Sequence, residues 1–156
     1  MATKNESRQV FETLCRALDN NDWKYDRDDE ELVATLGFRG EDLPMELTLR
    51  VDEEHMLIMI LSKLPFEIPE DKRIDISLAV SAANWGMVNG SFDYSIAKGA
   101  LIYRVANSYR DSLIGVDAID YMIGIVLGAV ENYNDKLFMI SKGLLSIEKF
   151  IEEEQQ

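Results

Sequence analysis

The feature that most constrains the fold is an apolar stripe in the last third of the sequence, whose members recur at alternating steps of four and three residues. The stripe consists of Ile119, Ile123, Val126, Val130, Tyr133, Leu137, Ile140, Leu144, Ile147 and Ile151. This spacing places the side chains on one side of an α-helix. The sequence therefore predicts either one long helix lying across a sheet or a helix pair, with a kink or division at Gly143.

Additional apolar residues widen this stripe beyond the seam of a coiled coil. They are Met122, Leu127, Phe138 and Leu145. A coiled coil buries a narrow strip, whereas a helix packed on a globular core buries a broader face. The width therefore favours a helix on a core over a self-standing coiled coil.

Alternation of apolar and polar residues predicts strands in the middle of the chain. Residues 45–52 alternate most clearly, and residues 32–38 do so as well. Residues 91–96 and 101–105 alternate on either side of Lys98-Gly99, which predicts a hairpin. Residues 56–61 are apolar throughout, so we expect a strand covered on both faces, either by a helix or by another subunit.

Two further helices are expected before the long one. The capping-box pattern Thr3-Lys-Asn-Glu6 predicts a first helix that runs to about Leu18. Pro69, followed by two acidic residues, predicts the start of a second helix that Asn89-Gly90 ends. We expect the second helix to bury the face formed by Ile74, Leu78, Ala82, Trp85 and Val88. Residues 23–26 predict a short strand, and residues 27–31 an acidic turn.

These elements predict a single α+β domain over residues 1–156, with a frayed tail at 152–156. The expected order is helix, three strands, helix, two strands and helix, with the short segment at 23–26 as a possible addition to the strands. We expect two layers, in which an antiparallel sheet is packed by helices.

The charge and the cysteine content exclude several classes of partner. The formal net charge of −13 repels nucleic acid and anionic membranes. No apolar segment approaches the ~20 residues that a spanning helix needs. The single cysteine, Cys15, excludes an internal disulfide and predicts a reducing, cytoplasmic location.

The acidic segment after Tyr25 resembles the opening of a calcium-binding loop. Asp26, Asp28 and Glu30 have the required spacing. Glu31 stands where the loop needs glycine, however, and Gly37 where it needs the closing glutamate. The sequence therefore predicts no metal site.

Residues that could support catalysis are isolated. His55 is the only histidine, and we expect it in an exposed turn. Ser95 and Lys98 have the spacing of a serine–lysine pair, but they fall in the expected hairpin. Cys15 lies by the apolar face of the first helix, where burial makes a thiol inert. Phosphate-binding loops and nucleophile elbows are absent from the sequence.

Several segments resemble the YbjN-domain family. They are Leu64-Pro-Phe-Glu-Ile-Pro-Glu-Asp-Lys-Arg, Asn84, Asn89-Gly-Ser-Phe-Asp93, Gly99-Ala-Leu-Ile-Tyr-Arg104 and the helix after Gly115 that contains Tyr133. The likeness covers roughly residues 11–150. It implies a fold similar to that of type III secretion chaperones, frequent dimerisation, and a bacterial role in signalling or chaperone-like protein binding. The family supplies no catalytic residues.

We therefore expect a dimeric, non-enzymatic module without a cofactor, which holds an extended segment of another protein on an apolar face or at a sheet edge. Its candidate contact residues, for which ordinary core packing is the alternative, are Met45, Leu47, Leu49, Met56, Ile58 and Met59.

Two other classes of function remain as alternatives. A small-ligand sensor would have a pocket between sheet and helices near Trp85 and Tyr103. An enzyme would use two carboxylates brought together in a deep pocket. The candidate carboxylates are Asp93, Asp111, Asp117 and Asp120.

Overall fold

A computed structural model describes residues 4–155. Its helices are α1 (Lys4–Asn20), α2 (Arg73–Trp85), α3 (Val116–Ser141) and α4 (Ile147–Glu154), and a 3₁₀ turn, η1 (Glu70–Lys72), precedes α2. Its strands are β1 (Asp26–Asp28), β2 (Val33–Arg39), β3 (Pro44–Asp52), β4 (Leu57–Lys63), β5 (Ser91–Ser95) and β6 (Ala100–Ser108).

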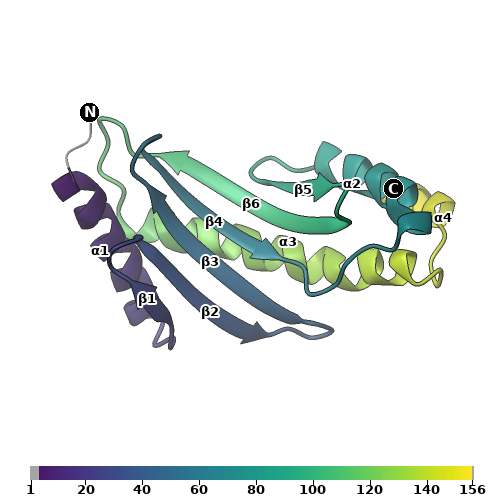
Figure 1. Ribbon diagram of the computed structural model, residues 1–156, viewed down its shortest axis with the longest axis horizontal. Helices are drawn as coiled ribbons and strands as arrows, with labels where there is room; N and C mark the ends of the chain where they lie inside the picture. The colour runs from purple at the N-terminus through teal and green to yellow at the C-terminus, as the bar shows by residue number, and fades with distance from the viewer. Residues whose placement is uncertain (1–3, 156) are drawn as a thin grey trace.

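The strands form one antiparallel sheet in the order β1-β2-β3-β4-β6-β5. Helix α3 runs along the sheet, α1 packs near one end of it, and α2 and α4 gather at the other end (Figure 1). This arrangement confirms the expected two-layer α+β fold and the order of its elements. The short strand β1 and the divided last helix are both variants that the sequence left open.

The core lies between the sheet and α3. Alternate residues of β3 and β4, including Leu47, Leu49, Ile58 and Ile60, are fully buried there. The periodic stripe supplies the opposite wall, because its members within α3 are buried except for the partly buried Tyr133. The apolar face of the strands, which repeats every two residues, therefore packs against the apolar face of the helix, which repeats about every 3.6 residues.

The stripe is divided at the position that the sequence indicated. Gly143 adopts a φ of +73°, in the left-handed region, directly after α3. Ser146 then caps α4, because its Oγ accepts a hydrogen bond from the Lys149 N–H at 3.2 Å. Leu144 falls in the turn and is exposed. The helix α4 extends to Glu154, so most of the tail expected to fray is helical.

Three hairpin turns share one construction. Leu32, Met56 and Gly99 each take a positive φ, and each is the fourth residue after one with a short polar side chain. These residues are Asp28, Asp52 and Ser95, and each side-chain oxygen accepts a backbone N–H within its turn. The calcium-like and serine–lysine patterns are thus parts of hairpin turns.

Two expectations about local structure are wrong. The first strand spans Asp26–Asp28, whereas the sequence predicted 23–26, because pairing with residues 33–35 sets the register. Helix α2 also presents the opposite face to the core. Its buried residues are Ile76, Ala79, Val80 and Ala83, whereas Trp85 is 93% exposed. The helix has two apolar faces, and the one with small residues allows closer packing.

Candidate functional site

The six residues predicted to contact a partner fall into two groups. Met45, Leu47, Leu49 and Ile58 point into the core and are at most 8% exposed. Met56 lies half-buried in the β3–β4 turn, and Met59 is half-buried on β4. These last two are more accessible to a partner than the other four, and a binding role for any of the six stays a prediction.

The face of the sheet opposite α3 carries an apolar row along its central strand. Leu57, Met59 and Leu61 of β4 point to this face and are half-buried. The neighbouring Ile102 and Ala106 of β6 extend the row, since they lie opposite Lys63 and Met59. The helices that pack on the sheet lie on its other side (Figure 1). The cover that the sequence predicted for both faces of β4 is therefore missing from one face within residues 4–155.

A notch opens at one end of the sheet, where β3 and β4 separate. The β3–β4 pairing ends at Thr48 opposite Leu61, whereas β2 continues beside β3 as far as Pro44. The space between them has a volume of about 730 Å³. We call it the β3–β4 notch, and its lining comprises Gly37, Phe38, Arg39, Pro44, Met45, Glu46, Thr48, Lys63, Leu64, Pro65, Phe66 and Glu67.

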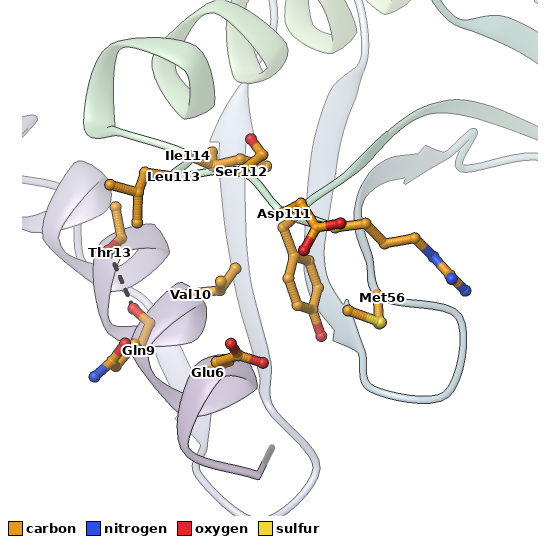
Figure 2. Close-up of a pocket in the computed structure, with 11 residues that line it drawn as sticks. Glu6, Gln9, Val10, Thr13, Met56, Asp111, Ser112, Leu113 and Ile114 are labelled. Atoms are coloured by element: carbon orange, nitrogen blue, oxygen red, sulfur yellow. Dashed lines mark hydrogen bonds between the residues drawn. The ribbon is translucent and has the colours of Figure 1, made fainter. Parts of the chain in front are cut away.

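A second cavity, of about 560 Å³, separates α1 from the loop that follows β6. Figure 2 shows Glu6, Gln9, Val10 and Thr13 on α1, Met56 and Asp111 across from them, and residues 112–114 along the loop that leads back toward Thr13. Tyr109 also lines this cavity, and its hydroxyl group forms a buried hydrogen bond of 2.9 Å with the Ser7 hydroxyl group. That bond ties α1 to the end of β6. Both polar and apolar side chains line this cavity.

Helix α2 and the loop after it expose an uncharged apolar surface. Ile74, Leu78, Trp85 and Val88 are 70%, 48%, 93% and 102% exposed. We call these four residues the α2 stripe. Ser81, which is exposed at the helical position between Leu78 and Trp85, adds no charge. The sequence indicated the apolar face that contains the stripe but predicted that it is buried. The second apolar face, at Ala79 and Ala83, was the sequence signal that the opposite side of the helix could pack on the core instead.

The residues considered for catalysis are separate from one another. The single histidine, His55, is exposed, and its Nδ1 lies 3.0 Å from Asp52 Oδ2. The hydrogen bond that the His55 N–H donates lowers the pKa of Asp52. Burial raises the pKa of the Cys15 thiol, which disfavours the reactive thiolate. Within residues 4–155, no group of three or more His, Cys, Asp or Glu side chains could hold a metal ion.

The predicted carboxylates do not gather in a pocket. Asp93 forms an ion pair of 2.7 Å with Arg104, and Asp120 accepts a hydrogen bond from Asn21. Asp111 lines the α1 cavity, whereas Asp93, Asp117 and Asp120 line neither cavity. No two of the four predicted aspartates therefore line the same one of these cavities.

Trp85 and Tyr103, near which a ligand pocket was expected, do not lie together. Trp85 is exposed on the far side of α2, and Tyr103 is 1% exposed. The Tyr103 ring packs edge-on against Phe92 with 5.0 Å between centroids, which fills the space. Neither residue lines either cavity.

The described residues contain no helix long and apolar enough to cross a membrane. No curated protein shows significant similarity to the sequence. The YbjN family model, described as "Putative bacterial sensory transduction regulator", matches residues 11–139.

Three solved structures share the fold. A chain of the HopA1–SchA chaperone–effector complex aligns with a TM-score of 0.58 at 11% identity, covering 86% of this chain and 99% of that one. A chain of the ExsC–ExsE complex aligns with a TM-score of 0.59 at 13% identity, covering 84% and 95%. YbjN from E. coli, described as a "putative transcription regulator", aligns with a TM-score of 0.58 at 11% identity, covering 81% and 92%.

Proposed function

The chain belongs to the YbjN family, and from this premise we propose that it is a non-enzymatic, homodimeric module that holds an extended segment of another protein. Its role is chaperone-like or that of a signalling regulator, in the cytoplasm. One structural neighbour belongs to a chaperone–effector complex, which supports protein binding. The observation that carries the proposal is the exposed α2 stripe.

The exposure of the α2 stripe is costly for an isolated chain. Trp85 and Val88 leave almost their whole surface in water, and burying a large apolar side chain contributes about 1.5–3 kcal/mol. Single exposed apolar residues are ordinary, but contiguous exposed patches mark interaction sites. From Ile74 to Trp85 the stripe extends about 17 Å along the helix. It therefore offers a continuous contact line.

A second copy of this chain suits the stripe because the stripe carries no charge. A twofold contact places the same surface on both sides, so like charges would repel across it. In a chain of net charge −13, an uncharged surface is where two copies can approach with least repulsion. The four side chains expose on the order of 600 Å² per copy, and flanking residues bring this near the ~800 Å² per partner of a stable interface.

The test is the molar mass of the purified protein by light scattering across a concentration series. We expect a dimer for the natural sequence and a monomer for Trp85→Asp, because the aspartate would bring two buried charges together at the interface. Leu113→Asp is the matched control, since Leu113 is equally exposed but lies in the loop before α3. It should remain dimeric. Circular dichroism checks that all three proteins are folded.

A strict monomer at high micromolar concentration would refute the homodimer, and a dimer that survives Trp85→Asp would refute the α2 stripe as its interface. Trp85 also reports the contact directly. In a Trp23→Phe background it is the only tryptophan, and its emission should shift to shorter wavelength as the dimer forms.

A further inference from the structure

We propose that the β3–β4 notch receives an extended partner segment as an added strand, in which apolar residues alternate with acidic residues. The inference rests on the proposed function, because it names the place and the chemistry of the segment that the module holds. The free edge of β3, the floor of the notch and the charges at its rim support this proposal.

The start of β3 lacks a neighbouring strand on the side facing β4. Beyond Lys63 the chain follows β6 instead of β3, since the Leu64 N–H donates to the Leu101 carbonyl at 3.0 Å and the Ile68 N–H donates to the Gly99 carbonyl at 2.8 Å. Residues 44–47 of β3 therefore have no partner in the β4 register. Four residues of extended chain correspond to about 13 Å of strand edge.

The register also shows which backbone groups face the notch. Alternate residues of an antiparallel strand direct both N–H and C=O to the same neighbour. The Val51 N–H donates to the Leu32 carbonyl before β2. The backbone groups of Val51 therefore face β2. Glu46 lies an odd number of residues from Val51, so its backbone N–H and C=O point to the β4 side, where no strand residue pairs with it. An added strand would supply that partner, as in strand-addition complexes.

The floor of the notch is apolar and held by the core. Phe38 packs edge-on against Trp23 with 4.9 Å between ring centroids, and Phe66 packs against Phe138 of α3 at 5.3 Å. Both phenylalanines remain half-buried, so each offers part of its ring to a ligand. The pocket exists before binding, which lowers the entropy cost of capturing a segment.

The rim toward the uncovered sheet face is locally basic. Arg39, Lys63 and nearby Arg50 are exposed and make no ion pair among residues 4–155. Strand alternation places Glu46 on this face within the notch and Asp52 on the same face farther along β3, and Glu67 follows Phe66 outside the sheet. In an added strand, successive side chains point to opposite faces. Apolar residues would meet the floor while acidic residues meet this rim.

The experiment measures fluorescence anisotropy of a labelled eight-residue peptide that alternates valine and glutamate. We expect saturable binding that weakens about five- to tenfold in Glu46→Pro, which removes the N–H facing the notch but leaves the bonds to β2. A peptide N-methylated on its glutamates, whose N–H groups face β3 in an antiparallel pair, should lose a similar factor. Lys63→Glu should weaken the valine–glutamate peptide and favour a valine–lysine peptide, whereas Lys98→Glu, an equal charge change in an exposed turn, should change neither.

The possible failures can be told apart. Binding that is unaffected by Glu46→Pro and Lys63→Glu but lost in Met59→Asp would overturn the notch and keep protein binding, on the uncovered sheet face. Absence of saturable binding of both peptides to folded protein at millimolar concentration would overturn the notch outright. Repeating the titration with Trp85→Asp separates peptide binding from dimerisation. A monomeric variant that still binds the peptide supports the notch, and the molar-mass measurement tests the dimer independently.

Discussion

Individual residues set the hairpin turns through side-chain hydrogen bonds. Asp28 and Asp52 each accept backbone N–H groups inside their turns. These bonds hold Leu32 and Met56 at positive φ, a conformation that costs a residue with a side chain about 1–2 kcal/mol. The aspartates are therefore structural, although in sequence they look like a metal loop or an acidic surface.

The first prediction concerns the pH dependence of the Asp52 turn. The His55 N–H, and then the His55 side chain, lower the pKa of Asp52 below its usual value. A carboxylate with a lowered pKa stabilises the fold above its unfolded pKa of about 3.9, and this contribution is lost as the pH falls through the folded pKa. The difference in free energy of unfolding between the natural protein and Asp52→Asn should shrink on acidification from about pH 6 to about pH 3.

Urea denaturation at several pH values gives this difference. Glu53→Gln removes an equal charge from the same turn and is the control. A difference between the natural protein and Asp52→Asn that stays constant with pH would contradict the assignment of the shift to the turn.

At the scale of elements, the division between α3 and α4 depends on one glycine and one tyrosine. Gly143 takes the left-handed conformation that ends α3. The Tyr133 hydroxyl then donates to Glu154 Oε2 at 2.7 Å and holds α4 against α3. Burial and this bond raise the pKa of Tyr133 to about 12. The docking of α4 thus follows from the turn and not from helix propensity alone.

The second prediction compares two glycines. Gly143→Ala should lower the free energy of unfolding by about 1 kcal/mol, because φ is +73° and a Cβ is disfavoured there even though its nearest neighbours are 3.9 Å away. Gly124→Ala should raise it by about 0.5–1 kcal/mol, since Gly124 lies within α3 with open space around it. Urea denaturation measures both, and shifts of the same sign would contradict this explanation of the turn.

At the scale of the whole molecule, the α2 stripe is an uncharged contact area on a protein with a large negative charge. The net charge of −13 repels a second copy at long range. The α2 stripe contributes no charge, so salt has no ion pair there to weaken. We expect the long-range repulsion to control how dimerisation depends on salt.

The third prediction follows from this balance. Raising NaCl from about 50 mM to about 500 mM should strengthen the dimer, because shorter screening lengths reduce repulsion between the two acidic copies. Sedimentation equilibrium gives the dissociation constant at each concentration, with sucrose as a control for general solvent effects. A dimer that weakens with salt would instead indicate that charged pairs hold the interface.

The sequence by itself determined the elements whose signal is local. The steps of four and three residues from Ile119 to Ile151 predicted the helical stripe, and Gly143 its division. Strict alternation predicted the strand from Met45 to Asp52. These patterns reflect the helical and extended repeats of the backbone, which neighbouring residues are enough to reveal.

The tertiary structure decided which apolar surfaces are left in water. Trp85 and Ile76 lie on different faces of one helix, and only packing against α3 and the sheet shows that Ile76 is inside. Likewise, Met45 and Leu47 are core residues, while the notch beside them arises because β4 leaves β3 to follow β6. Burial depends on contacts between residues far apart in the chain, and periodicity gives the direction of a face but not what covers it.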